Sequence, residues 1–384
     1  MKRALGWFVS ALMFCVILPT VRADGGNTET VFVEDFYRAQ VQEILREGEE
    51  EYLGNVIFTQ WLLVELLEGQ DQGMSLELPY RNSFGEDPAQ KMTVGEKVIV
   101  VKTAYDGESS YRFFERYRLR PLWVLFFFFI GITLLVSGKR GLGSLLGLAV
   151  TLVILTKWLV PQIVSGGNPI LVSFFGSVVI ASLSLFLAHG FHKRTVISWV
   201  SLLITLGISL LLALFSVSFA HLFGMGSEEA INLTFGMFDK VDLKGLLLGA
   251  IVIGALGILD DVVTTQVATV AEIHDAHSTF SFWELYRRGL SVGKEHIASL
   301  VNTLVIAYAG ASLPVFLFIT TSENPLWVIL NNEFMAEEIV RTLVGSTTLI
   351  LAVPISTFLA AYVYTRRTVG RGQHVCLLAK EGIQ

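Results

Sequence analysis

The chain has 384 residues, of which 53% are hydrophobic, and a mean hydropathy of +0.60. This composition excludes an ordinary soluble globular protein and indicates a polytopic helical membrane protein that lies in the lipid bilayer. The formal net charge is −6; acidic and basic residues are segregated along the chain, and nucleic acid is not an expected partner. Because Cys15 and Cys376 are the two cysteines and Cys15 falls in a predicted leader, the mature chain has neither an intrachain disulfide nor a cysteine metal site.

Residues 1–23 have the features of a secretory signal peptide. Lys2 and Arg3 precede the apolar run 4–19, and small residues follow before Asp24. We expect the mature chain to begin near Asp24. The alternative is an uncleaved anchor helix, which adds one span and still exports the residues that follow.

Residues 24–118 are polar and predict a separate, exported soluble domain. Its candidate strands are Ala39–Arg46, Thr59–Leu67, Met74–Pro79, Lys97–Thr103 and Tyr111–Tyr117. Five short strands of this size fit a small OB-like β-barrel, a fold that does not by itself define a ligand. The acidic run 47–51 lacks the alternating carboxylates of a calcium loop and predicts a solvated loop.

Residues 119–365 predict a membrane bundle of seven spans, because seven apolar runs have about the length of a bilayer. The runs are 121–137, 141–160, 169–189, 196–220, 243–262, 296–319 and 338–364. Basic residues concentrate in alternate connections and in the tail 366–384, whereas the other connections are uncharged or mainly acidic. The positive-inside rule therefore predicts an extracytoplasmic N-terminal domain and a cytoplasmic C-terminus.

The fifth run ends in two adjacent carboxylates, Asp260 and Asp261. At helical spacing Asp261, Thr265 and Glu272 form one stripe, and Asp260 lies on the neighbouring one. A helix from 243 to 277 would be about 50 Å long against a hydrocarbon core of about 30 Å, so we expect it to break near Gly254 or Gly257 or to emerge from the bilayer. Ionisable groups at this depth usually face a protein interior or a wet cavity. The alternative is that both aspartates have reached the headgroup region.

A second polar stripe follows on the sixth run. Residues 282–290 have an apolar face beside Arg287 and Arg288 and predict a short helix at the cytoplasmic interface. The next span carries His296, Asn302 and Thr303 at helical intervals. Two polar stripes joined by one interfacial helix suggest a shared intramembrane site.

Paired carboxylates in a low-dielectric site tend to hold one proton between them. The hypothesis is therefore a transporter of a small solute or ion in which an aspartate couples proton movement to transport. The candidate residues are Asp260, Asp261, Thr265, Gln266, Glu272, His296, Asn302 and Thr303. We predict no cofactor and no metal site, and we interpret His274 and His277 as part of a hydrated loop.

Two other classes of function compete with transport. An intramembrane aspartyl hydrolase needs two carboxylates that face each other across a water, whereas Asp260 and Asp261 point about 100° apart on a helix. An enzyme is therefore not predicted. A scaffold, whose exported domain binds a protein partner while the bundle anchors it, should tolerate neutralisation of Asp260, Asp261 and His296 together.

The second half of the chain contains a set of residues that recurs as a pattern in one family: Gly254–Val262, Thr265, Gln266, Glu272, Arg287–Gly289, Gly293, His296–Ser299, Val301–Leu304 and Ala307–Pro314. In these residues the chain resembles the YibE/F-like family of bacterial multi-pass membrane proteins. The resemblance implies a small exported β-domain followed by a membrane bundle, here in the inner membrane. It implies no particular activity and no catalytic residues.

Overall fold

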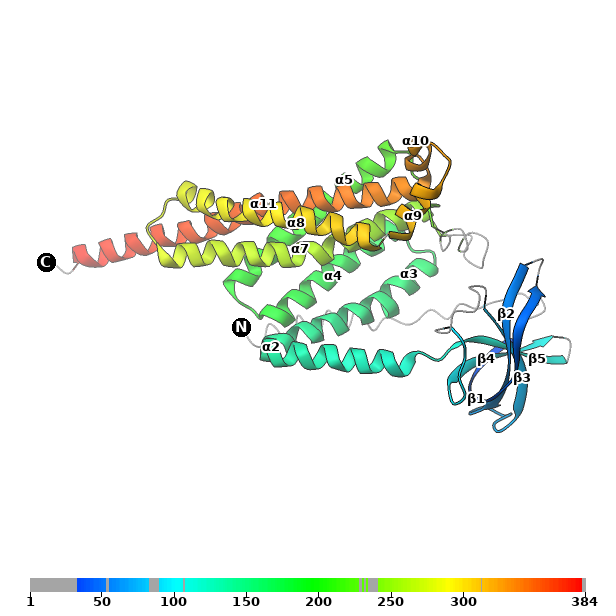
Figure 1. The fold of residues 1–384 in the computed structure, drawn as a ribbon. Helices are drawn as coiled ribbons and strands as arrows, with labels where there is room; N and C mark the ends of the chain where they lie inside the picture. Colours follow the sequence, from blue (N-terminus) through cyan, green and yellow to red (C-terminus); the bar gives the residue numbers. More distant parts are fainter. Residues whose placement is uncertain are drawn as a thin grey trace. The chain divides into compact units, whose positions relative to one another are not determined.

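The structure is a computed structural model that describes residues 33–52, 55–82, 90–105, 108–227, 230, 233, 241–311 and 313–381; the predicted signal peptide lies outside them. The described residues divide into two compact units, one that ends at Ile132 and one that begins at Thr133. The first contains a β-sheet, and the second contains a helical bundle (Figure 1).

The sheet unit has the five antiparallel strands that the sequence predicts. They are β1 (Val33–Tyr52), β2 (Asn55–Leu66), β3 (Ser75–Asn82), β4 (Lys97–Tyr105) and β5 (Glu108–Arg116), in the order β3-β2-β1-β4-β5. Alternate residues such as Leu62 and Val64 of β2 are completely buried, as expected for strands with one face on a core. The register of β1 against β2 shifts twice between Val41 and Arg46, and such bulges bend a strand.

The two outer strands curl towards each other, so the sheet is a half-barrel. Tyr80 of β3 and Phe113 of β5 make an edge-to-face contact with ring centroids 4.9 Å apart. The Tyr80 hydroxyl donates to the carbonyl oxygen of Gln90 at 3.0 Å, and Arg116 of β5 donates to the same oxygen. The segment that begins at Gln90 therefore ties β3 to β5 through side chains.

The prediction of a solvated loop at residues 47–51 is wrong, because these residues belong to β1 and pair with β2. Glu47 stands opposite Gln60, and Glu50 stands opposite Ile57. The amide of Gln60 donates to Glu47 at 3.1 Å, and the Trp61 indole donates to Glu50 at 2.9 Å. Hydrogen-bond donors on β2 therefore stabilise the acidic residues of β1 in the sheet. The acidic composition of residues 47–51 does not indicate that such donors lie opposite.

Ion pairs hold the connection between β2 and β3. Hydrogen bonds from the Arg38 side chain lower the pKa of Glu68 to about 2. Lys102 and Tyr111 donate to Asp71 at 2.7 Å and 2.6 Å, and they lower the pKa of the Asp71 carboxyl. This turn is therefore fixed to β1, β4 and β5.

The helical elements begin where the sheet ends. They are α2 (Leu119–Ile154), a π-helical turn (Leu155–Leu159), α3 (Val160–Val164), α4 (Pro169–His189), α5 (Lys193–Phe219), α7 (Leu243–Ala276), α8 (Phe282–Ala311), α9 (Leu313–Thr321), α10 (Leu326–Leu330) and α11 (Glu333–Glu381). Within the described residues, five segments are long and apolar enough to cross a membrane. These are Leu119–Val164, Pro169–His189, Lys193–Phe219, Leu243–Ala276 and Glu333–Arg366.

The chain changes direction within α2 at Gly138, where φ is 55° and ψ is −131°. A Cβ atom on Gly141 would lie 2.7 Å from the carbonyl oxygen of Thr133. In a straight helix these two residues are about 12 Å apart along the axis. The turn therefore falls between the predicted runs 121–137 and 141–160.

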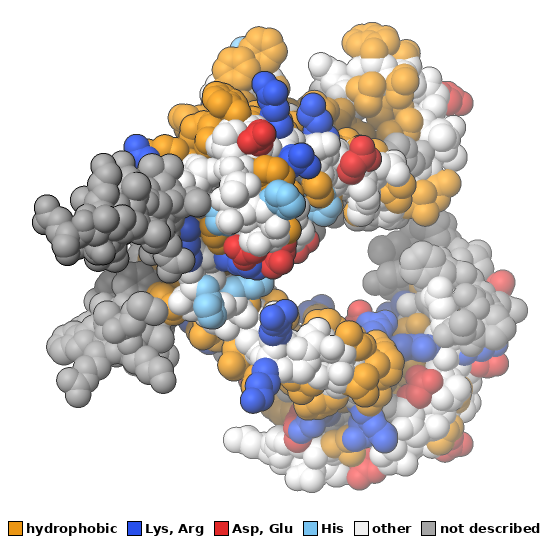
Figure 2. Space-filling model, turned by 90° about the vertical axis from the view of Figure 1, so that its left-hand side faces the viewer, with side chains coloured by type: hydrophobic (Ala, Val, Ile, Leu, Met, Phe, Trp, Pro, Cys, Tyr) orange, Lys and Arg blue, Asp and Glu red, His pale blue; other side chains and the backbone are white. Residues whose placement is uncertain are grey.

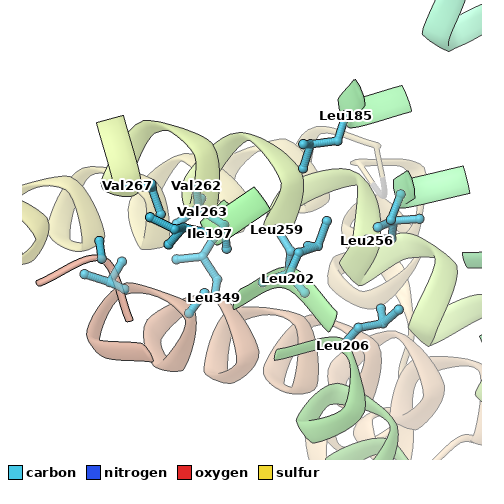
Figure 3. Close-up of a cluster of buried hydrophobic side chains, with 14 of the residues drawn as sticks. Leu185, Ile197, Leu202, Leu206, Leu256, Leu259, Val262, Val263, Val267 and Leu349 are labelled. Atoms are coloured by element: carbon cyan, nitrogen blue, oxygen red, sulfur yellow. The ribbon is translucent and has the colours of Figure 1, made fainter. Parts of the chain in front are cut away.

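Helix α7 runs through the middle of the bundle and packs against α4, α5, α8 and α11. Figure 3 shows the apolar core around it, with side chains from α4, α5, α7 and α11 directed towards one another. Close approach depends on small residues, as is typical of membrane helices. A Cβ atom on Gly249 would lie 2.3 Å from the Ser173 hydroxyl oxygen of α4, and one on Gly143 would lie 2.8 Å from the Leu187 carbonyl oxygen.

Helix α7 does not break at Gly254 or Gly257; it continues for 34 residues, because a glycine inside a helix keeps its backbone hydrogen bonds when the neighbouring helices hold it. Of the two expectations for this long helix, the break is therefore wrong, and emergence from the bilayer stays a prediction. Residues 282–290 do not form a separate interfacial helix but are the start of α8, which is 30 residues long. Leu285 is completely buried, so packing inside the bundle determines where this segment lies.

The two ends of the helical unit have different chemistry. At one end Arg194 of α5 pairs with Glu272 and Asp275 of α7 at 2.7 Å and 3.0 Å. At the other end Glu333 and Glu337 of α11 accept hydrogen bonds from backbone amides of the segment 223–226. Ion pairs between α5 and α7 therefore lie at the first end, while carboxylates that accept from backbone amides organise the connection at the second.

Candidate functional site

A cavity of about 950 Å³ lies beside the polar face of α7. Its walls come from the second half of α2, from α4, α5 and α7, and from α11. The lining residues are Arg140, Ser144, Ser184, Ala188, His189, His192, Lys193, Arg194, Thr195, Ser198, Gly257, Asp260, Asp261, Thr264, Thr265, Ala268 and Tyr364. Most of them are polar, which is unusual for a space between apolar helices.

The two aspartates lie in the part of this cavity farthest from the Arg194 end. Asp260 and Glu272 are twelve residues apart on one helix, which corresponds to about 18 Å. Asp260 is half-buried and Asp261 is exposed to the cavity. Asp260 Oδ1 is completely buried, and none of the described residues hydrogen-bonds to it. A buried carboxylate oxygen without a donor is rare and calls for a partner.

Hydroxyl groups line the wall between the aspartates and the cavity entrance. Thr264 and Thr265 continue the α7 face, and Ser184, Thr195 and Ser198 face them from α4 and α5. The Thr264 hydroxyl donates to the Asp260 backbone carbonyl at 2.9 Å. A hydroxyl oxygen still accepts when its hydrogen is used in this way, so such a wall suits a hydrated solute.

Charged and aromatic side chains form the Arg194 end of the cavity. Arg194 joins α5 to α7 through its two ion pairs. The Lys193 ammonium lies 3.9 Å from the ring centroid of Tyr364 and donates to the Val363 carbonyl oxygen at 3.3 Å, which joins α5 to α11. Figure 2 looks at this end, where histidine, acidic and basic side chains lie side by side near the centre.

Gln266 belongs to a different face of α7. Its side chain is buried and donates to the Gly289 carbonyl oxygen of α8 at 2.9 Å and to the Thr357 hydroxyl oxygen of α11 at 2.7 Å. A Cβ atom on Gly293 would lie 3.0 Å from the Gln266 amide. This predicted site residue therefore links three helices and does not line the cavity.

The structure separates the two polar stripes that the sequence analysis joins. Among the residues with described side chains, the cavity lining includes Asp260, Asp261 and Thr265 but not His296, Asn302 or Thr303. His296 is half-buried, whereas Asn302 and Thr303 are exposed on α8. The aspartates face α2, α4 and α5. The expectation of one site shared by the stripes of α7 and α8 is therefore wrong for this arrangement of helices.

Several cavity residues are not among the sequence-predicted candidates, and His189 and Arg140 are the clearest. His189 is in the last turn of α4, and Arg140 follows the turn at Gly138. Arg140 belongs to a short basic connection, which the sequence analysis uses as a marker of topology, whereas His189 is the last residue of the predicted apolar run 169–189. A ring nitrogen and a hydroxyl group near the end of the same apolar run, as in His189 and Ser184, are the signal that could have indicated a site.

These observations define a helical membrane protein with a polar cavity among its apolar helices. A family model described as YibE/F-like protein matches residues 125–366. The chain belongs to the YibE/F-like family. No curated protein and no solved structure matches it.

Proposed function

We propose that this chain transports a small solute or ion across the bacterial inner membrane, and that Asp260 and Asp261 couple transport to protons. The observation that carries the proposal is the cavity itself, which reaches both carboxylates. Asp260 Oδ1 has no donor among the described residues, so a proton or the transported species can be its partner. Carboxylates at membrane depth that face a polar cavity are typical of proton and ion pathways.

Seven spans are the proposed topology. The change of direction at Gly138 supports two passes within Leu119–Val164, and α8 supports one more beside the other four candidate spans. The gathering of Arg140, Arg194 and Tyr364 around one cavity supports a common side for their connections. By the positive-inside rule that side is the cytoplasm, and the sheet unit is extracytoplasmic after a signal peptide. The cavity then opens to the cytoplasm.

An OB-like barrel is the proposed fold of the exported domain. The strand order β3-β2-β1-β4-β5, with contacts between β3 and β5, supports it, because an OB barrel closes in the same order. A protein partner of this domain is part of the proposal. The scaffold alternative keeps this partner and gives the cavity no role.

The solute enters from the cytoplasm past the basic end of the cavity, according to this proposal. The hydroxyl wall replaces part of its hydration shell. Proton exchange at Asp260 or Asp261 then changes the charge next to the solute, so that binding and release depend on the proton gradient. The residues of this chain supply the charge and the hydrogen bonds, and no catalytic step is involved.

The test uses purified protein in liposomes that contain a pH-sensitive fluorescent dye. The probe is the fraction of bacterial cytosol below about 1 kDa, a mass that corresponds to small solutes. We expect the wild-type protein to change the internal pH beyond the change in liposomes without protein. Asp260→Asn and Asp261→Asn should abolish this difference, because an amide does not exchange a proton in this range.

The control variant is Glu323→Gln, which neutralises an exposed carboxylate outside the described cavity, and it should behave like the wild type. Equal responses from the wild type and both aspartate variants contradict proton coupling at this site. A wild-type response equal to that of empty liposomes contradicts it as well. Either result favours the scaffold, in which the bundle only anchors the exported domain.

A further inference from the structure

Helix α8 has one face inside the bundle and one face outside it. Leu285, Gly289 and Gly293 are buried against α7 and α11. The opposite stripe is exposed and has intervals of three and four residues. Its members are Val292, Glu295, Ser299, Asn302 and Ile306. This spacing is that of a helix-to-helix seam, but no described helix covers it.

The exposed stripe lies at the depth of the two aspartates. Gly289 packs against Val270 and Gly293 against Gln266, so α8 runs antiparallel to α7. For a residue of α8 and a residue of α7 at the same depth, the two residue numbers therefore add up to about 559. Ser299 is therefore level with Asp260. Figure 1 shows α8 alongside α7 and α11. Because α7 and α11 contain candidate spans, Ser299 and Asn302 lie at bilayer depth.

Polar side chains at that depth need partners. The side chains of Glu295, Ser299 and Asn302 make no hydrogen bond or ion pair within the described part of the chain, whereas Thr303 donates to the Ser299 carbonyl oxygen at 2.9 Å. Lipid tails offer neither donors nor acceptors. A protein surface is therefore the appropriate cover for the stripe.

We propose that the exposed stripe of α8 is the interface with a second copy of this chain. Copies that share one membrane orientation are related by an axis along the membrane normal, which brings equivalent residues together. The carboxamide of Asn302 and the hydroxyl of Ser299 each carry a donor and an acceptor, so each can pair with itself. The two Glu295 side chains also meet in this arrangement, and the exposed Lys294 beside each of them can neutralise that charge.

The exposed face of α5 differs in this respect. Exposed positions of α5 such as Leu211 and Phe215 are apolar, with exposed fractions of 67% and 66%, and lipid satisfies them. The stripe combines helical spacing, self-complementary polar groups and an adjacent pair of opposite charges. Charge and hydrogen-bonding complementarity with itself is the reason to assign this surface to a second copy.

The test is disulfide cross-linking of the full-length protein in native membranes. Cys15 and Cys376 are first replaced by serine, and a single cysteine is then placed by Ser299→Cys or Asn302→Cys. Oxidation with copper phenanthroline should give a product of twice the chain mass for both positions. The matched control is Leu211→Cys, which is exposed on α5 and should stay monomeric.

A second variant tests the hydrogen bond itself. Interhelical hydrogen bonds in membranes contribute about 0.6–2 kcal/mol, which corresponds to about 3- to 30-fold in association. Asn302→Leu in the Ser299→Cys background should lower the dimer yield by that factor, and Asn302→Gln should restore most of it. Absence of the dimer at both positions, equal yields at Leu211, or a product of a different mass overturns the proposal. These outcomes do not depend on transport activity.

Discussion

The contact between α2 and α4 gives a sharp test of the packing that forms the cavity wall. We predict that Gly143→Ala destabilises the helical unit, because its Cβ atom would lie 2.8 Å from the Leu187 carbonyl oxygen and 3.3 Å from the Ala188 Cα atom. Ordinary contact begins at about 3.4 Å, and both neighbours are backbone atoms that cannot rotate away. The two helices must therefore separate by about 0.6 Å. Overpacking of this kind costs about 1–3 kcal/mol.

The measurement is the thermal unfolding midpoint of the purified protein in detergent. A destabilisation of 1 kcal/mol lowers the midpoint by about 2–4 °C in a unit of this size. The control is Gly254→Ala, because a Cβ atom there has no neighbour within 4 Å, and it should not lower the midpoint. Gly147→Ala should fall between them, since its nearest contact is the Ser184 hydroxyl oxygen at 3.1 Å. If Gly143→Ala and Gly254→Ala have the same midpoint, the close approach of α2 and α4 is refuted.

Three further predictions concern other parts of the molecule. Gly138→Ala should destabilise the protein by about 1–2 kcal/mol, because a side chain is strained at φ 55°; a melting curve that matches the wild type would refute this. Gln266→Met should lower the free energy of unfolding by about 1 kcal/mol, because two hydrogen bonds are lost at nearly constant volume. Hydrogen exchange should then rise in α8 around Gly289. The pKa of Glu68 is lowered from 4.5 to about 2, so its pairing with Arg38 stabilises the sheet above pH 4.5 and is lost as the pH falls from 4.5 towards 2. The slower hydrogen exchange of residues 66–74 in the wild type than in Glu68→Gln should therefore shrink over that range, and a difference as large at pH 2 as above pH 4.5 would contradict the assignment.

The sequence predicts the sheet and most helical segments because each has a local periodicity. Alternating apolar residues place the five strands within a few residues of their observed bounds, with the largest error in β1. That error has a non-local cause, since Gln60 and Trp61 supply the donors for Glu47 and Glu50. The acidic composition of residues 47–51 carries no information about a neighbouring strand.

The candidate site is predictable along one helix but not between helices. Helical spacing correctly places Asp261 and Thr265 on one face of α7, and both line the cavity. Helical spacing does not predict which neighbouring helix lies opposite that face. The sequence analysis pairs it with α8, the next segment along the chain, whereas the cavity is built with α2, α4 and α5. The choice depends on which helices approach closely, and this is set by glycines such as Gly143 and Gly249 on other faces.

The angular positions on α7 explain why one polar stretch serves two purposes. Gln266 is two residues from Ala268, which lines the cavity, and this spacing places the two side chains about 160° apart around the helix axis. Gln266 therefore points away from the cavity. Gln266 binds α7 to α8 and α11, while Asp260 and Asp261 face the wall built by α2, α4 and α5.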